Sequence, residues 1–233
     1  MPVTRACFTA GTLMEFADLF PPECAFRVLD LPSAVVLTGR ECELAAAMAE
    51  GPRLLFTLSR GAAHECLRAL GARELEIGRG RDRQPLWPEA FVVSITHTTG
   101  LAAAVVGRAG EFRSLGVDVE ACDREINPAI RTRICSPEEL EIFDDCPRTL
   151  LSVLGAKESI YKACYPLGGV RLFFGDVVLE AVSGGFNCHL KRQVAPELEV
   201  GSLIEVRQRI RDGMLYSAVH LPVSARLDYA SAD

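Results

Sequence analysis

The chain has 233 residues, a net charge of −6 at pH 7 and a hydrophobic fraction of 49%. This length is enough for one domain or two small ones, and the hydrophobic residues are enough for a sizeable core. The negative charge excludes a nucleic-acid footprint over the chain as a whole, so an anionic ligand or an acidic protein partner needs a local basic patch.

The nine cysteines form no Cys-x-x-Cys pair, and the four histidines show no metal-ligand spacing with them. We therefore predict small apolar fillers in a reducing cytoplasm, not a disulfide framework. The N-terminus has no basic start followed by a long apolar run, and no stretch has the length needed to span a bilayer. We expect neither a signal peptide nor a membrane anchor.

After a short expected strand at 35–37, a helical pattern runs over residues 41–70 and is broken at Gly51-Pro52, so that its main helix covers residues 53–70. A proline marks the start of this helix, and Gly71 lies just past its end. One side of the helix carries an apolar stripe, formed by Leu55, Leu58, Ala62, Cys66 and Leu70. The opposite side carries Arg53, Arg60, His64 and Arg68. That side is either a solvated charged face or an edge that binds phosphate.

A loop over residues 78–88 is rich in arginine, glycine and proline. Its Arg79, Arg81 and Arg83 suit a nucleotide phosphate, although an ordinary basic loop has the same composition. The apolar run at 91–95 then predicts a strand that ends in Thr-His-Thr. Taken alone, a histidine in this place is most often a hydrogen-bonded structural residue.

Two further strands are predicted over residues 101–107 and 112–120, around a turn. The second is apolar except for Asp118 and Glu120. Because successive side chains of a strand point to opposite faces, these two carboxylates point the same way. Two acids at the end of a buried strand indicate a site more than a solvating surface.

The next part of the sequence, from residue 136, predicts two helices. Ser-Pro-Glu-Glu at 136–139 predicts a helix over 137–143, with the glutamates as capping residues. A longer helix over 149–165 is expected to end at Pro166. Its Lys157 falls among the buried positions, where a charge needs a partner or must extend to the surface.

Glu158 and Lys162 are four residues apart on the longer helix and share a face. A solvated ion pair is the ordinary interpretation of that spacing. With Asp118 and Glu120, however, they offer three carboxylates and an ammonium to one point. Such carboxylates crowd together only if a cation or a proton relieves the repulsion. Hard oxygen ligands beside a lysine suit a magnesium ion that holds a phosphate substrate.

The remaining sequence predicts strands at 171–180, 185–191, 202–210 and 214–221, with Asp-Gly at 212–213 as a hairpin turn between the last two. Helices followed by strands occur in both halves. This order is compatible with an α+β fold of two similar subdomains.

Four of these stretches, taken together, resemble the signature of the 4'-phosphopantetheinyl transferases. They are Gly-Val-Asp-Val-Glu at 116–120, Ala-Lys-Glu-Ser-Ile-Tyr-Lys-Ala at 156–163, Arg-Gln-Pro-Leu-Trp-Pro at 83–88 and Ser-Ile-Thr-His at 94–97. The likeness is greatest to the large pseudo-dimeric branch, which includes the surfactin- and enterobactin-synthetase activating enzymes.

The resemblance implies two subdomains, each with a helix packed on a small antiparallel sheet, in a pseudo-twofold arrangement with the active site at their interface. The expected boundaries are 1–115 for the first subdomain, 116–225 for the second and 226–233 for a loose tail. It also implies transfer of 4'-phosphopantetheine from coenzyme A to a serine of an apo carrier protein, with adenosine 3',5'-bisphosphate as the other product.

The resemblance further implies site residues. Coenzyme A is expected to contact Arg53, Arg60, Arg83, Gln84, Pro85, Thr96, His97, Asp118, Lys157 and Lys162. Asp118, Glu120 and Glu158 are expected to hold Mg²⁺, with Glu158 and Lys162 as catalytic residues. Arg60 is the best match to the helix arginine of the family, with Arg53 as the alternative. Because Gln84 stands where many members have a basic residue, Arg83 is expected to supply the charge.

Leu-Gly at 154–155 departs from the family pattern of an aromatic residue followed by serine, cysteine or threonine, a change expected to loosen the helix. Two alternatives therefore stay open: a non-catalytic relative that binds coenzyme A or a carrier protein, and another magnesium-dependent enzyme that uses coenzyme A. We expect a cytoplasmic monomer that acts on peptidyl or acyl carriers of secondary-metabolite or siderophore synthesis, without nucleic-acid or membrane partners.

Overall fold

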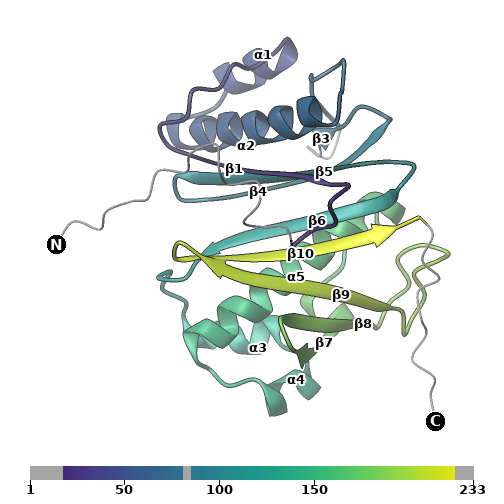
Figure 1. Cartoon of the computed structure of the whole chain (residues 1–233). Coiled ribbons are helices and arrows are strands. Elements are labelled where there is room, and N and C mark those ends of the chain that lie inside the picture. The colour runs from purple at the N-terminus through teal and green to yellow at the C-terminus, as the bar shows by residue number, and fades with distance from the viewer. Residues whose placement is uncertain (1–17, 81–84, 224–233) are drawn as a thin grey trace. The chain divides into compact units, whose positions relative to one another are not determined.

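The computed structural model of the chain describes residues 18–80 and 85–223 (Figure 1). The chain divides into two compact units, Met1–Ala109 and Gly110–Asp233. The division falls earlier than the boundary expected at residue 115, because strand β6 (Phe112–Ala121) pairs along its length with β10 (Met214–Pro222) of the second unit. The predicted tail at 226–233 lies outside the described residues.

The first unit is a three-stranded antiparallel sheet with one long helix across it (Figure 1). The strand order is β1-β5-β4, formed by β1 (Ala25–Asp30), β5 (Leu101–Arg108) and β4 (Phe91–Thr98). Helix α2 (Glu50–Ala69) packs on all three strands. The shorter α1 (Arg40–Ala46) contacts α2, and β2 (Gly78–Arg79) pairs with β3 (Pro85–Leu86).

Small residues bring α2 close to the sheet. Ala62, Ala63 and Cys66 of the helix are fully buried against β-strand residues such as Ala104. The predicted apolar stripe therefore faces the sheet, as expected. The helix begins before Pro52, which is compatible with its first turn because the first helical N–H groups need no partner there.

The expected strand at 35–37 is wrong. These residues form no regular element, and Val35 instead packs on Gly61 of α2. The strand of this region is β1, which pairs with β5 in register from Ala25↔Val106 to Asp30↔Leu101. Its partner lies far along the chain, so the local pattern gave no sign of the pairing.

The second unit is a five-stranded antiparallel sheet with the order β6-β10-β9-β8-β7. Besides β6 and β10 it contains β7 (Val177–Val182), β8 (Gly185–Leu190) and β9 (Leu203–Arg211). Helix α5 (Pro147–Gly168) packs on β6, β10 and β9. Short elements surround it: η2 (Pro128–Ile130), α3 (Arg131–Ile134), α4 (Pro137–Ile142) and η3 (Phe174–Asp176).

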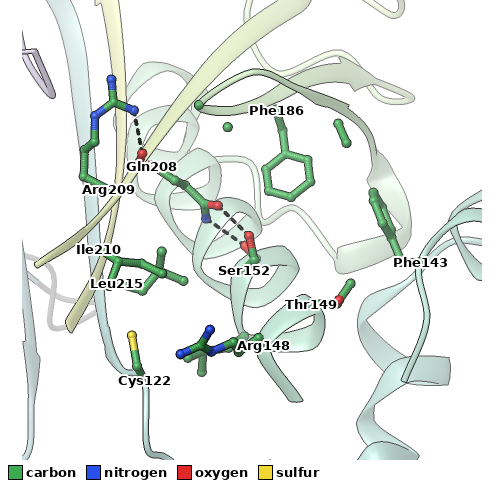
Figure 2. Close-up of a pocket in the computed structure, with 14 residues that line it drawn as sticks. Cys122, Phe143, Arg148, Thr149, Ser152, Phe186, Gln208, Arg209, Ile210 and Leu215 are labelled. Atoms are coloured by element: carbon green, nitrogen blue, oxygen red, sulfur yellow. Dashed lines mark hydrogen bonds between the residues drawn. The ribbon is translucent and has the colours of Figure 1, made fainter. Parts of the chain in front are cut away.

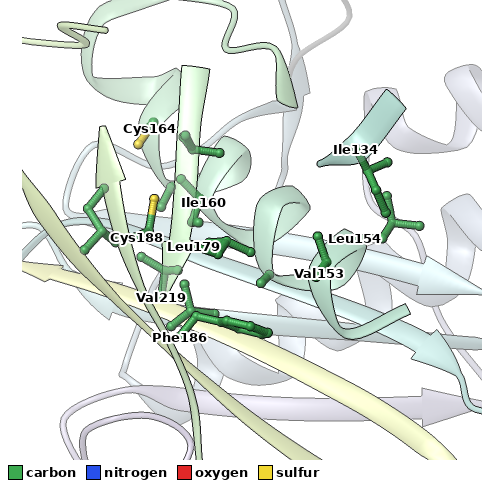
Figure 3. Packing of buried hydrophobic residues seen from close by; sticks show 14 of the residues in the cluster. Ile134, Val153, Leu154, Ile160, Cys164, Leu179, Phe186, Cys188 and Val219 are labelled. Atoms are coloured by element: carbon green, nitrogen blue, oxygen red, sulfur yellow. The ribbon is translucent and has the colours of Figure 1, made fainter. Parts of the chain in front are cut away.

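The core of this unit lies between α5 and the sheet (Figure 3). Val153, Leu154 and Ile160 of α5 belong to the same buried cluster as Leu179 and Phe186 of the strands. Burial of such side chains contributes roughly 1.5–3 kcal/mol each. Each unit therefore has a helix on a small antiparallel sheet, and the predicted α+β fold class is confirmed.

Two element bounds of the second unit differ most from expectation. Pro166 lies inside α5 and does not end it, because the φ of proline is helical and its missing N–H falls in the last turn of the helix. The helix ends instead at Gly168, before Gly169 in the left-handed conformation. Strand β7 begins only at Val177, because the Asp176 carboxylate accepts the Phe173 N–H and holds a 3-10 turn there.

The cysteines of the described part are free thiols. Cys66, Cys164 and Cys188 are fully buried in the two cores, and burial raises their pKa, for Cys164 to about 12. They act as apolar fillers there, as predicted. Among the helices of residues 18–80 and 85–223, none combines the length and apolarity required to cross a membrane.

Candidate functional site

The acidic group of the second unit depends on a close contact between α5 and β6. A Cβ atom added at Gly116 of β6 would lie 2.0 Å from the carbonyl oxygen of Ser159 on α5. A glycine is therefore needed at this crossing. The missing side chain lets α5 approach β6 closely enough for side chains of the helix to reach carboxylates of the strand.

Asp118 and Glu120 are both buried on β6, and each has a cationic partner. Lys162 Nζ donates to Asp118 Oδ1 at 2.7 Å and to the Val117 carbonyl at 3.1 Å. Arg124 Nη1 lies 2.6 Å from both carboxylate oxygens of Glu120. The predicted lysine and strand carboxylate are thus in direct contact.

The pKa of Glu158 depends on the other three side chains of this group. Burial is the largest cause that raises the pKa of its carboxyl, and the negative charges of Asp118 and Glu120 raise it further, while Lys162 opposes them. The four predicted side chains therefore lie within electrostatic reach of one another. A raised pKa of this origin is typical of functional sites.

The donor set suits a magnesium ion. Three carboxylates from neighbouring elements supply the hard oxygen atoms that Mg²⁺ prefers, and their mutual repulsion is relieved by a cation. Within residues 18–80 and 85–223 no group of three or more such side chains is gathered in metal-binding geometry. Asp118 and Glu120 are turned toward Lys162 and Arg124 instead.

Gly155 does not loosen α5, contrary to expectation, because the helix is continuous through it. A Cβ atom at Gly155 would lie 2.8 Å from Ser217 Oγ and 3.5 Å from Asp118 Oδ2. Ser217 of β10 is the register partner of Asp118. The glycine thus makes room where the helix faces the acidic strand position.

A hydrogen-bonded chain that sequence reasoning missed fixes Ser217. Gln208 Nε2 donates to Ser217 Oγ and to the Ser152 carbonyl, both at 2.8 Å, and Ser152 Oγ donates to Gln208 Oε1 at 2.5 Å. Figure 2 shows this amide directed toward Ser152 in a cavity of about 630 Å³ in the second unit. In the sequence, this chain of hydrogen bonds is indicated only by a polar residue, Ser217, at an inward position of a strand.

Lys157 does not have its predicted role. Its Nζ donates to Glu139 Oε2 at 2.6 Å, to the Phe174 carbonyl at 2.9 Å and to the Val177 carbonyl at 3.2 Å. These contacts use its three hydrogens, and only 2% of the residue is exposed. We therefore remove it from the residues expected to bind coenzyme A.

Glu139 has the predicted capping role and a second one. It forms a capping box with Ser136 at the start of α4. Its fully buried carboxylate also accepts the Lys157 ammonium and the Leu179 N–H. It is thus the partner that the buried lysine requires, and not a ligand of the acidic group.

A cavity of about 740 Å³ in the first unit collects several predicted residues. Arg60 and His97 line it, together with Arg79 and Pro85. The other lining residues are Leu31, Met48, Gly51, Pro52, Leu54, Leu55, Phe56, Ser59, Ile95, Thr99 and Gly100. An apolar cavity with a few converging cationic groups is a suitable binding site for an anionic small molecule.

The other residues predicted for coenzyme A differ in position. Thr96 is buried in β4, where strand alternation turns it away from the face of His97. Arg53 is exposed at the start of α2 and is not part of the cavity lining. Arg83 and Gln84 lie outside the described residues.

Arg60 is not on a solvated helix face, and neither is His64. Both are buried, and both face the buried carboxylate of Glu41, with distances to Oε1 of 3.6 Å from Arg60 Nε and 3.1 Å from His64 Nε2. Burial lowers the pKa of Arg60 to about 10, opposed by Glu41 and assisted by Arg79. The arginine therefore stays charged at neutral pH.

Sequence reasoning missed Glu41, although two signals point to it. Thr38 and Glu41 have the spacing of a helix-capping pair, and the Glu41 carboxylate accepts both the N–H and the hydroxyl of Thr38. Arg60 and His64 are four residues apart, so both present to one neighbour on the same side of α2.

Two family models match the chain. The 4'-phosphopantetheinyl transferase N-terminal domain matches residues 40–107, and the 4'-phosphopantetheinyl transferase superfamily matches residues 114–201. The first match covers the cavity of the first unit except Leu31, from α1 to β5. The second covers β6, α5 and the acidic group.

Similar proteins of known name belong to the same family as these two models. The 4'-phosphopantetheinyl transferase PptT of Mycobacterium tuberculosis is 32% identical over 190 residues, which are 76% of this chain and 82% of the relative. The 4'-phosphopantetheinyl transferase Npt of Nocardia iowensis is 28% identical over 207 residues, 83% of this chain and 93% of the relative. Enterobactin synthase component D of Salmonella typhimurium is 34% identical over 109 residues, 45% of this chain and 44% of the relative.

The fold and these matches define a transferase that uses coenzyme A. The chain belongs to the 4'-phosphopantetheinyl transferase superfamily. It is an enzyme that transfers 4'-phosphopantetheine from coenzyme A to carrier proteins.

Proposed function

We propose that Asp118, Glu120, Glu158 and Lys162 form the catalytic centre of this transferase. The observation that carries the proposal is the contact of α5 with β6, where Lys162 Nζ lies 2.7 Å from Asp118 Oδ1, and where burial and the charges of Asp118 and Glu120 raise the pKa of Glu158. Holding three carboxylates together in this way is costly for folding alone. Such an energetic cost is expected where the carboxylates take part in a reaction.

In the proposed reaction, the hydroxyl oxygen of a carrier-protein serine attacks the β-phosphorus of coenzyme A. A bond forms between that oxygen and phosphorus, and the bond from phosphorus to the bridging oxygen breaks. Adenosine 3',5'-bisphosphate leaves with the bridging oxygen and its electron pair. Glu158 is the proposed base that accepts the serine proton.

Lys162 has the second catalytic role in this proposal. Its ammonium lies 2.7 Å from Asp118 Oδ1, so it is held in place before a substrate arrives. A fixed positive charge of this kind stabilises negative charge on the transferred phosphate without reorganisation during the reaction. Positioning and charge neutralisation are the main contributions that phosphoryl-type transfer needs.

We propose Mg²⁺ as the metal, with Asp118, Glu120 and Glu158 as the residues that would hold it. When bound, the ion supplies positive charge to the pyrophosphate and to the leaving phosphate. The three carboxylates are of the right chemical type and belong to neighbouring elements of one unit.

We propose the cavity of the first unit as the binding site for a phosphate-bearing part of coenzyme A. Arg60, Arg79 and His97 supply its polar groups, and Pro85 forms part of its wall. Arginine is well suited to phosphate because its planar group offers several N–H donors. Arg83 and Gln84 keep their predicted role as a proposal.

The carrier proteins in this proposal are peptidyl or acyl carriers of secondary-metabolite or siderophore synthesis. The support is the likeness to a relative named enterobactin synthase component D. We also propose a monomer in the cytoplasm, without nucleic-acid or membrane partners, on the basis of composition and charge.

The proposed function is tested by the mass of apo peptidyl and acyl carriers incubated with the protein, coenzyme A and magnesium chloride. Each true substrate gains the mass of one phosphopantetheine, and a chelator abolishes the gain. A gain that persists with the chelator would contradict the metal assignment. A panel of both carrier types without any gain would contradict the carrier assignment.

A further inference from the structure

A buried carboxylate lies directly behind the cavity arginine of the first unit. Glu41 of α1 is 0% exposed, and its Oε1 faces Arg60, His64 and the Ile77 N–H. Burial acts to raise the pKa of Glu41, but hydrogen bonds from His64 and Thr38 and the charge of His64 outweigh it and lower the pKa. Glu41 is therefore an ionised group in the interior at neutral pH.

Arg60 is a buried cation held between a carboxylate and two aromatic rings. Its side chain is only 5% exposed, and its guanidinium lies over the rings of Phe56 and Trp87, at 4.9 Å and 5.7 Å from their centroids. Nε and Nη1 are buried without a hydrogen-bond partner among the residues that the structure describes. Because Arg60 lines the cavity, this buried cation is poised to bind an anion there.

We propose that Glu41 is a positioning residue for coenzyme A: it fixes the Arg60 guanidinium from behind so that the positive charge of Arg60 faces a phosphate in the cavity. Glu41 itself does not line the cavity, so it acts through Arg60. This inference rests on the proposed binding of coenzyme A in the first unit. It assigns a role to a buried charge that the proposed function does not use.

Glu41 has two opposite effects on an anion in the cavity. Its negative charge repels the anion, so removal of the charge alone would tighten binding. Its carboxylate also fixes Arg60, so removal would leave a buried guanidinium with no counter-charge and no defined position. The amide in Glu41→Gln keeps the size of the side chain and removes the charge. The direction of the change in affinity therefore tells which effect dominates.

The test is calorimetric binding of coenzyme A and of adenosine 3',5'-bisphosphate to four proteins: wild type, Glu41→Gln, Arg60→Gln and the double variant. We expect Glu41→Gln to weaken coenzyme A binding roughly tenfold, the scale of one charge-assisted hydrogen bond. In the Arg60→Gln background the same substitution should cause no further loss. Glu43→Gln, at an exposed position of the same helix, is the matched control and should bind like wild type.

The outcomes separate the inference from the proposed function. Unchanged or tighter binding in Glu41→Gln would overturn the inference, as would a loss that persists in the Arg60→Gln background, which is the mark of a merely structural role. If Arg60→Gln itself binds coenzyme A normally, the proposed role of Arg60 fails as well.

A second variant covers the case that Glu41→Gln does not fold. Glu41→Asp keeps the charge and draws the carboxylate back from Arg60 by one methylene. We expect a smaller loss of coenzyme A affinity, absent again in the Arg60→Gln background. Wild-type affinity in Glu41→Asp would contradict the positioning role.

Discussion

Lys162 of α5 donates a 2.7 Å hydrogen bond to Asp118 of β6, and this contact joins the helix and the strand that carry the acidic group. It is possible because Gly116, two residues before Asp118, has no side chain between the two elements. The position of one glycine thus decides whether the side chains of the proposed catalytic centre can meet.

The first prediction concerns this crossing. Gly116→Ala should destabilise the fold by about 2 kcal/mol or more, because its Cβ would lie 2.0 Å from the Ser159 carbonyl oxygen and 3.0 Å from the Cβ of Ala163. Urea unfolding measures the change. Gly110→Ala is the control, because nothing lies within 4 Å of its Cβ position. Equal stability of the two variants would contradict the packing argument.

A second prediction concerns the pH dependence of catalysis. Lys162 holds down the pKa of Glu158, which burial and two carboxylates raise. Since the proposed base must be deprotonated, activity falls as the pH drops through this pKa. Lys162→Met should therefore move the acid limb of the kcat/KM profile to higher pH, besides lowering the maximal rate. An acid limb that stays in place or moves to lower pH would argue against Glu158 as the base.

The raised pKa of Glu158 also predicts a gain in stability when its charge is removed. In the pH range between the ordinary glutamate pKa and the raised folded value, the folded state binds more protons than the unfolded state, so stability falls as the pH rises through it. Above that range the full cost of the charge remains.

Glu158→Gln should therefore raise the Tm at pH 7, and the gain should shrink at pH values below the ordinary glutamate range, where the native side chain is protonated in both states. Thermal unfolding across this pH range measures the difference. A lower Tm for the variant at pH 7 would show that the charge stabilises the fold instead.

The sequence alone predicts most of the acidic group. Strand and helix periodicities place Asp118 with Glu120, and Glu158 with Lys162, and the structure brings the four within electrostatic reach. Both periodicities depend only on residues close together in the chain, so they can be recognised in the sequence. The pairing of Glu120 with Arg124 was not foreseen, since the arginine lies past the end of the strand.

Long-range partners could not be predicted. Arg60 and His64 belong to the polar side of a helix pattern, and only packing of Glu41 against them buries that side. Lys157 similarly forms an ion pair with Glu139, which lies on another helix. Pattern analysis tells which positions of a helix are polar, whereas burial of a charge depends on a counter-charge from elsewhere in the chain.

Gly155 gives a further prediction. Gly155→Ala should lower both stability and activity, because its Cβ would lie 2.8 Å from Ser217 Oγ, which Gln208 holds by a hydrogen bond. Ser217→Ala removes the obstructing oxygen, so the double variant should recover much of the loss. Unfolding and carrier-labelling rates are measured on all three variants. Strictly additive losses would exclude this contact as the cause.

The most direct test of the proposed catalytic centre is the single-turnover rate of carrier labelling by Glu158→Gln and Asp118→Ala, with saturating coenzyme A and magnesium. Glu141→Gln, at an exposed position of α4, is the matched control. We predict a loss of at least about 100-fold in each site variant, the scale of a lost proton-transfer group, with the control at the wild-type rate. Site variants that label the carrier at near-normal rates would contradict the assignment of catalysis to the acidic group of β6 and α5.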